Sequence, residues 1–109
     1  MSGTKEGGSR VICILVTSSP ESENTRTLFK ITEAAIAMGH QVQIFLMSDG
    51  VYHILCQSLS TLIAKGAEVA LCTYDAMERG LDKKTGIYFG SYYDLAVMVA
   101  KADGFLALT

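Results

Sequence analysis

The chain has 109 residues, which is enough for one compact domain with its own core. Half of the residues are hydrophobic and only 18% are charged, so the composition excludes an intrinsically disordered protein. The formal net charge of −2 gives no electrostatic reason to expect nucleic acid or an anionic membrane as a direct ligand.

Residues 1–9 are rich in glycine and serine and predict a flexible tail, which leaves residues 10–109 as a single domain. The start of the chain lacks the apolar segment of a signal peptide, roughly 7–15 residues long, and no run reaches the ~18 apolar residues of a membrane span. We therefore expect a cytoplasmic protein with no membrane association.

An apolar run at residues 11–16 predicts a first strand that is covered on both faces. Residues 18–22, which contain the only proline, end this strand. Asn24 then predicts a helix cap, and Gly39 is expected to stop the helix. The apolar face of this helix is expected to consist of Leu28, Ile31, Ala35 and Met38.

Alternation of polar and apolar residues from residue 41 predicts a second strand, which ends at residues 48–50. A second helix is expected at about residues 52–65, with Gly66 as its terminator. Its apolar face is expected to carry Tyr52, Cys56, Leu59 and Ile63. A third strand follows at residues 67–72.

After a short helix and the turn-rich residues 80–86, Ser91 and Asp94 have the spacing of a capping box. This box predicts a nearly all-apolar helix at residues 95–102, followed by a last strand at residues 105–108. Strands that alternate with helices indicate β-α-β units with right-handed crossovers. The expected fold class is α/β: a three-layer α/β/α sandwich around a mostly parallel sheet of four to five strands.

The three cysteines cannot all pair, and they lack the spacing of zinc ligands, so we expect free thiols and no metal. Cys13 lies in the middle of a strand and Cys56 on the apolar stripe of a helix, which predicts core positions for both. Cys72 differs because it ends a strand directly before a helix, whose free N–H groups favour a thiolate. The alternative is that Cys72 is simply buried, as free cysteines often are.

Ligands of parallel sheets bind beyond the carboxyl ends of the strands, where Cys72 is expected. His53 follows the second strand at that edge, and it is expected either to reach Cys72 as a base or donor or to face solvent. Asp75 and Arg79 are four residues apart and predict a surface ion pair. A carboxylate so close to Cys72 would oppose thiolate formation, so Asp75 is not expected to activate the thiol.

Aromatic residues gather near the end of the chain, and they indicate either core packing or a docking surface. They are Tyr88, Phe89, Tyr92 and Tyr93. The mean hydropathy of +0.31 similarly indicates either apolar surface left for self-association or a sheet that is buried on both faces.

Residues 71–81 resemble the cysteine segment of the DsrE/DsrF-like family of sulfur-relay proteins: a strand delivers Cys72, a helical stretch follows, and an Arg-Gly-apolar triplet closes it at residues 79–81. Residues 45–52 are similar to the exit of the family's second strand. The resemblance extends over residues 11–108, which is almost the whole domain.

The resemblance implies that Cys72 carries a persulfide and passes its outer sulfur onward, as a sulfur carrier or sulfurtransferase subunit. It also implies sulfur-donor and sulfur-acceptor proteins as partners, a homo-oligomer (trimer or hexamer) and no cofactor. A lone cysteine suits this role, because a second nearby thiol would release the sulfur as sulfide. The candidate supporting residues are Asp49, Tyr52, His53, Thr73 and Arg79.

Two other functions remain open. The hydroxyl-rich loop after the first strand would suit a flavodoxin-like binder of nucleotide or flavin, although Glu21 and Glu23 would repel phosphate. A non-catalytic assembly subunit, in which Cys72 is only a core residue, is the third hypothesis.

Overall fold

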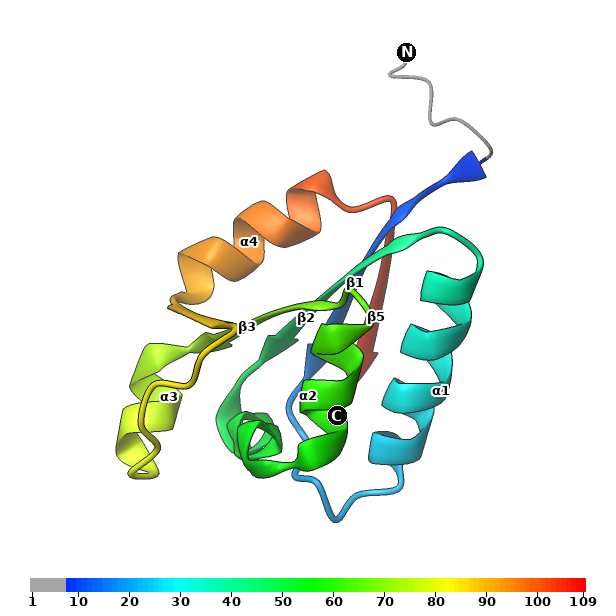
Figure 1. Ribbon diagram of the computed structural model, residues 1–109. Helices are drawn as coiled ribbons and strands as arrows, with labels where there is room; N and C mark the ends of the chain where they lie inside the picture. Colours follow the sequence, from blue (N-terminus) through cyan, green and yellow to red (C-terminus); the bar gives the residue numbers. More distant parts are fainter. Residues whose placement is uncertain (1–7) are drawn as a thin grey trace.

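The computed structural model describes residues 8–109, and over that range it forms a five-stranded, all-parallel sheet with the strand order β4-β3-β2-β1-β5 (Figure 1). The strands are β1 (Val11–Val16), β2 (Gln41–Leu46), β3 (Glu68–Cys72), β4 (Ile87–Gly90) and β5 (Gly104–Leu108). The helices are α1 (Asn24–Ala37), the 3-10 helix η2 (Ser48–Leu55), α2 (Gln57–Ala64), α3 (Thr73–Glu78) and α4 (Tyr92–Lys101). Residues 1–7 of the predicted tail lie outside the described residues.

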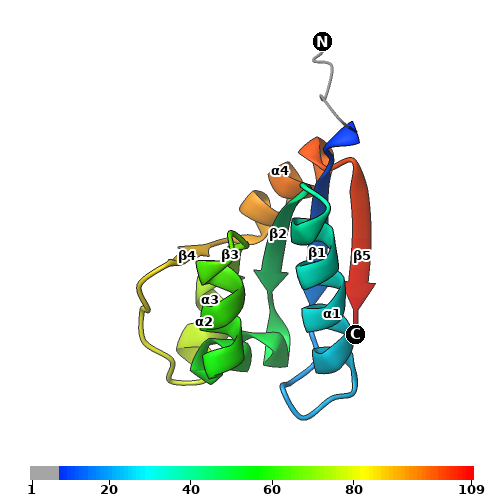
Figure 2. The same cartoon turned by 45° about the vertical axis from the view of Figure 1, so that its right-hand side comes forward.

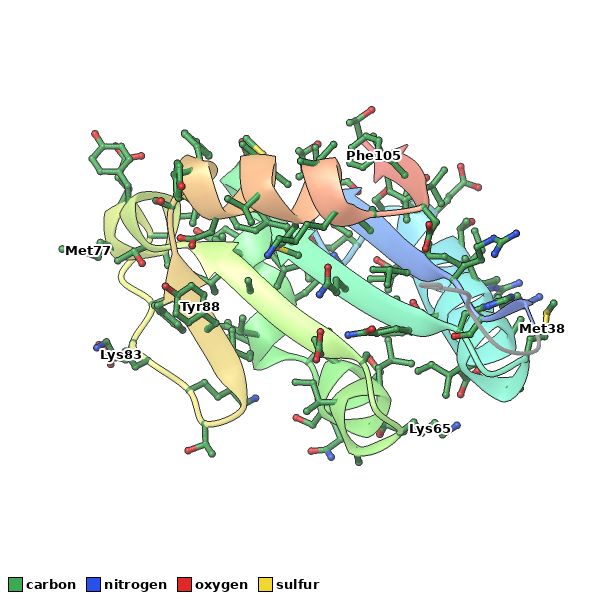
Figure 3. All side chains as sticks on the ribbon, turned by 90° about the horizontal axis from the view of Figure 1, so that it is seen from above. Met38, Lys65, Met77, Lys83, Tyr88 and Phe105 are labelled. Atoms are coloured by element: carbon green, nitrogen blue, oxygen red, sulfur yellow. The ribbon has the colours of Figure 1, made fainter. Side chains whose placement is uncertain are left out.

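Helices lie on both faces of the sheet, which confirms the predicted α/β sandwich (Figures 1 and 3). α1 and α2 cover one face, and α4 covers the other (Figure 2). From β1 through β2 to β3 and β4 the chain crosses the sheet in one direction, whereas α4 returns it from β4 to β5 at the opposite edge. Because crossovers between parallel strands are right-handed, the returning helix must lie on the opposite face.

The two faces of the sheet carry hydrophobic cores of different size. The face under α1 and α2 holds the larger core, with fully buried side chains such as Ile14, Leu28, Ile44, Leu59 and Leu62. On the other face, Phe45, Ala70 and Cys72 form a small buried cluster against partly buried side chains that include Leu95 and Met98 of α4. Within α4 itself no residue is fully buried, so this apolar helix leaves part of its surface exposed.

The predicted helix over residues 52–65 is wrong in its first half. The chain instead forms η2, leaves helical geometry at Cys56 (φ −93°, ψ 131°) and resumes as α2. Gly50 permits the tight path of η2, because a Cβ there would collide with the last carbonyl oxygen of β1. Cys56 is half-buried and occupies the N-cap position of α2 instead of lying on a core stripe. The buried residues of α2 are Leu59 and Leu62.

The first helix has the predicted extent but a different start. Asn24 is its first residue and makes no cap; its side-chain amide donates to the Ser18 hydroxyl instead, at 3.4 Å. Met38 is 70% exposed, so it lies outside the predicted apolar face. Gly39 has φ 86° and ends the helix as predicted, since this left-handed conformation suits glycine.

The strand β4 has no counterpart among the predicted elements, because its four residues carry no period-2 pattern and follow a turn-rich segment. With β4 the sheet has five strands, which is the larger of the two numbers predicted. The predicted capping box is confirmed: the Ser91 backbone N–H donates to the Asp94 carboxylate at 2.8 Å, and the reciprocal bond is also present. Among residues 8–109, no helix is long and apolar enough to cross a membrane.

Candidate functional site at the β3–β4 switch point

Cys72 and Gly90 are paired in register at the carboxyl ends of β3 and β4. After Cys72 the chain enters α3, whose buried Ala76 belongs to the core under α1 and α2. After Gly90 it enters α4 on the opposite face. Neighbouring parallel strands whose connections leave toward opposite faces create a crevice between them, which is the usual ligand position in open α/β sheets.

A pocket of about 420 Å³ occupies this crevice. It is lined by residues from both sides of the switch point, namely Cys72, Thr73, Tyr74, Met77, Gly90, Ser91 and Tyr92. Tyr74 and Met77 are 67% and 69% exposed and stand at the surface, and Met77 projects outward from α3 in Figure 3. The pocket therefore joins a mostly apolar entrance to a thiol at its base.

Cys72 is recessed rather than presented openly to solvent. The residue is only 3% exposed and packs with Phe45 and Ala70, in agreement with the alternative that Cys72 is buried. The Asp75 backbone N–H lies 3.5 Å from the Cys72 sulfur and donates to it. Because Cys72 lines the pocket, a reactant would approach the sulfur through that pocket.

Asp75 is the central polar residue of the site, and its predicted surface ion pair with Arg79 is wrong. Asp75 is only 6% exposed, and its carboxylate accepts hydrogen bonds from the Ser48 backbone N–H at 2.7 Å and from the Tyr92 hydroxyl at 3.1 Å. A buried carboxylate needs such donors, because it would otherwise lose its hydration without replacement. The same residue therefore links α3 to η2 and to α4.

Arg79 connects α3 to η2 at the surface. Its Nε donates to the Asp49 carboxylate at 3.0 Å, and its Nη1 donates to the backbone carbonyl of Asp75 at 3.0 Å. The hydrogen bond to Asp49 is the largest cause that raises the pKa of Arg79. Asp49 and Arg79, two of the candidate supporting residues, thus contact each other, and Arg79 also contacts the backbone of α3.

Tyr92 is the residue of the site that the sequence did not single out. Its hydroxyl donates to the Asp75 carboxylate, and the residue lines the same pocket as Cys72. Desolvation, and then the hydrogen bond to Asp75 and the nearby Cys72 thiol, raise the pKa of Tyr92 to about 12, although the residue as a whole is 50% exposed. The position of Tyr92 was the signal that could have identified it. The capping box at Ser91 makes Tyr92 the first residue of α4, just after the end of a strand.

The structure does not bring His53 to Cys72. His53 is fully buried, which also contradicts a solvent-facing position, and its Nε2 lies 3.1 Å from the Ser18 carbonyl oxygen. The Nδ1 atom has no hydrogen-bond partner among the described residues. Burial is the largest influence on the ring and lowers the pKa of His53, against smaller opposing effects of Ser18 and Glu21. His53 therefore packs against the segment that follows β1 and not against Cys72.

The remaining predicted residues divide between the pocket and its surroundings. Thr73 is the first residue of α3 and lines the pocket, whereas Tyr52 is a half-buried residue of η2 close enough to influence Arg79. Cys13 is fully buried, as predicted, and burial raises the pKa of its thiol. Between residues 8 and 109 no group of three His, Cys, Asp or Glu side chains could hold a metal ion.

The four aromatic residues are not one cluster. Phe89 packs against the larger core, whereas Tyr88 and Tyr93 are 61% and 76% exposed. Tyr92 alone reaches the polar contacts at the base of the pocket. Core packing is thus confirmed for Phe89, whereas a docking surface at the exposed tyrosines stays a prediction.

Comparison with protein families agrees with this geometry. The model of the DsrE/DsrF-like family matches residues 10–108, which is nearly the entire chain. The chain belongs to the DsrE/DsrF-like family. The predicted family resemblance is thereby confirmed.

Individual relatives support the same assignment of fold. An uncharacterized protein of Methanopyrus kandleri, MK0008, is 28% identical, and the match covers 93% of this chain and 95% of the relative. The crystal structure of YchN from E. coli superimposes with a TM-score of 0.69 at 24% identity, covering 92% of this chain and 99% of YchN. A conserved protein of unknown function from Bacteroides thetaiotaomicron, BT1422, superimposes with a TM-score of 0.76 at 15% identity, covering 94% and 98%. At these identities the two structures show the fold alone.

Proposed function

We propose that this protein is a sulfur carrier, with sulfurtransferase activity, that holds sulfane sulfur as a persulfide on Cys72. The observation that carries the proposal is the position of Cys72 at the base of a pocket at the β3–β4 switch point, where the Asp75 N–H donates to its sulfur. Membership of the DsrE/DsrF-like family supports the same chemistry.

The transfer needs no external oxidant or reductant. The Cys72 thiolate attacks the outer sulfur of a donor persulfide, R–S–SH, and the S–S bond of the donor breaks. The products are Cys72–S–SH and the thiolate R–S⁻. An acceptor thiolate then attacks the outer sulfur of Cys72–S–SH, and Cys72 leaves as a thiolate. Each step forms one S–S bond and breaks one, so the electrons balance.

The partners of this reaction are a sulfur-donor protein and a sulfur-acceptor protein. The chain itself acts as a homo-oligomer, a trimer or hexamer. Two features support self-association: α4 has no fully buried residue, and Phe105 on the adjacent edge strand is 49% exposed. Size-exclusion chromatography with light scattering tests this part of the proposal independently of sulfur transfer.

Intact mass spectrometry after incubation with a persulfide donor tests the function. We expect the mass to increase by one sulfur atom, the adduct to map to Cys72, and a thiol reductant to remove it. Cys72→Ser should abolish the adduct, whereas Cys56→Ser, a half-buried cysteine outside the pocket, should retain it. An adduct that persists in Cys72→Ser would contradict the proposal.

The low exposure of Cys72 favours one other function, a non-catalytic assembly subunit. In that case Cys72→Ser would lower thermal stability, and neither the parent nor the variant would take up sulfur. The same pair of proteins therefore separates the two functions.

A further inference from the structure

The polar contacts at the base of the pocket form a chain from α4 to the thiol. The Tyr92 hydroxyl donates to the Asp75 carboxylate at 3.1 Å, and the Asp75 backbone N–H donates to the Cys72 sulfur at 3.5 Å. Tyr92 and Cys72 line the same pocket, and Cys72 is among the neighbours that raise the pKa of Tyr92. A backbone donor thus contacts the sulfur, and Asp75 holds the Tyr92 hydroxyl in the same pocket.

We propose that the Tyr92 hydroxyl is a catalytic hydrogen-bond donor that stabilises negative charge on the Cys72 sulfur when the outer sulfur leaves for its acceptor. This inference rests on the proposed function, because it assigns a role in the hand-off step. In the resting protein the hydroxyl hydrogen points to Asp75. Rotation about the C–O bond redirects this hydrogen toward the sulfur in the hand-off step, since the hydrogen of a hydroxyl turns freely to suit its acceptor.

The hand-off step is where such a donor has the largest effect. As the acceptor attacks the outer sulfur, the S–S bond breaks and its electron pair goes to the Cys72 sulfur, which becomes a thiolate. This charge develops in a recessed position, where the buried carboxylate of Asp75 opposes it. A donor placed beforehand offsets that repulsion, as donors aimed at developing charge do in other active sites.

The surroundings favour Tyr92 as donor over the other side chains of the site. The pKa of about 12 keeps its hydroxyl protonated at neutral pH, so that it donates and does not add a second negative charge. Tyr74 contacts Glu78, and Asp94 caps α4. The guanidinium group of Arg79 donates its hydrogen bonds to Asp49 and to a backbone carbonyl. Among the described side chains lining the pocket, Thr73 and Ser91 also carry hydroxyls. The Ser91 hydroxyl is engaged with Asp94, and Tyr92 is the one whose hydroxyl is bonded to Asp75, the residue that contacts the sulfur.

Tyr92→Phe tests the proposal, because it removes the hydroxyl and keeps the ring. Tyr93→Phe is the matched control: the same change on the neighbouring residue, which is 76% exposed and does not line the pocket. Each protein is first loaded with persulfide and then mixed with cyanide as the acceptor. Cyanide attacks the outer sulfur to give thiocyanate, and Cys72 leaves as a thiolate. We expect Tyr92→Phe to release thiocyanate about tenfold more slowly, the effect of losing one hydrogen bond to a charged group.

A second readout does not depend on persulfide chemistry. Iodoacetamide alkylates only the thiolate, and peptide mapping gives the rate at Cys72 alone. Loss of a donor to the thiolate should slow alkylation of Tyr92→Phe at pH 7, and the difference should vanish at strongly alkaline pH. A ring that merely restricted access would instead change the rate equally at every pH. Thermal melts of the three proteins establish that each is folded at the assay temperature.

The outcomes separate this inference from the function beneath it. If the parent protein takes up no sulfur, the carrier function fails, and alkylation still decides the role of Tyr92. If sulfur is taken up and Tyr92→Phe matches the parent in both assays, the carrier function stands and the role of Tyr92 is overturned. A slowdown in Tyr93→Phe as large as that in Tyr92→Phe would also overturn it.

Discussion

The Asp75 carboxylate accepts a hydrogen bond from the backbone N–H of Ser48 at 2.7 Å, which fastens the start of η2 to the first turn of α3. Ser48 has φ 51°, the left-handed conformation that non-glycine residues rarely adopt. The bond to a buried carboxylate holds this conformation in place. The same carboxylate receives Tyr92, so the backbone strain at Ser48 and the polar chain beside Cys72 share one anchor.

The first prediction concerns this anchor. Asp75→Ala removes the acceptor from two part-buried donors and should lower the free energy of unfolding by about 1.5–3 kcal/mol, the range for hydrogen bonds to a charged group. Chemical denaturation measures the change. Asp82→Asn, a substitution at an exposed carboxylate, is the control and should change stability by less than ~0.5 kcal/mol. Equal stability of the two variants would show that Asp75 is not an anchor.

Gly50 should tolerate no side chain. A Cβ at this position would collide with the backbone carbonyl oxygen of Val16, which cannot move without disturbing β1. We expect Gly50→Ala to lower the free energy of unfolding by ~1–3 kcal/mol or more. In Gly104→Ala the new methyl group meets open space, so that variant should stay close to the parent in a thermal melt. Similar melting temperatures for both variants would contradict the collision.

The stability of the fold should depend on pH through His53. Burial lowers the pKa of His53 in the folded state, so below the ordinary value of about 6.5 the unfolded chain binds more protons than the folded one. Stability should therefore fall as the pH drops from 7 toward 5, by at most ~1.4 kcal/mol per pH unit for one group. Denaturation midpoints across this range measure the slope.

His53→Gln should flatten that slope, because the amide can still donate to the Ser18 carbonyl and does not titrate. His40→Gln is the control at a half-exposed histidine, whose Nδ1 accepts from the Arg10 backbone N–H at 3.1 Å. An unchanged slope in His53→Gln would assign the pH dependence to other groups.

The ion pair between Arg79 and Asp49 should matter less than the buried anchor beneath it. The Asp49 side chain is 62% exposed, and exposed pairs contribute little because solvent and salt screen them. Asp49→Asn should therefore cost less stability than Asp75→Ala, and the cost should shrink further in high salt. It should also leave alkylation of Cys72 unchanged, since Asp49 does not line the pocket. A loss of Cys72 reactivity in Asp49→Asn would place this pair within the working site.

Predictions from the sequence succeeded where one local signal dominates. The apolar run of β1, the left-handed stop at Gly39 and the capping box at Ser91 were each readable because they depend on a few adjacent residues. The start of the second helix could not be predicted in this way. Its residues have a helical apolar period, yet the close approach of Gly50 to β1 holds them in a 3-10 helix that breaks at Cys56.

The site shows the same division. A lone cysteine at the end of a strand and before a helix, in a segment typical of the DsrE/DsrF-like family, was predictable because strand periodicity and residue spacing are local properties. The recessed position of this thiol, the inward turn of Asp75 to Ser48 and Tyr92, and the contact of His53 with Ser18 emerged from the fold alone. Burial and hydrogen-bond partners depend on which distant segments pack together, and the unpredicted strand β4 brings Tyr92 into the pocket of Cys72.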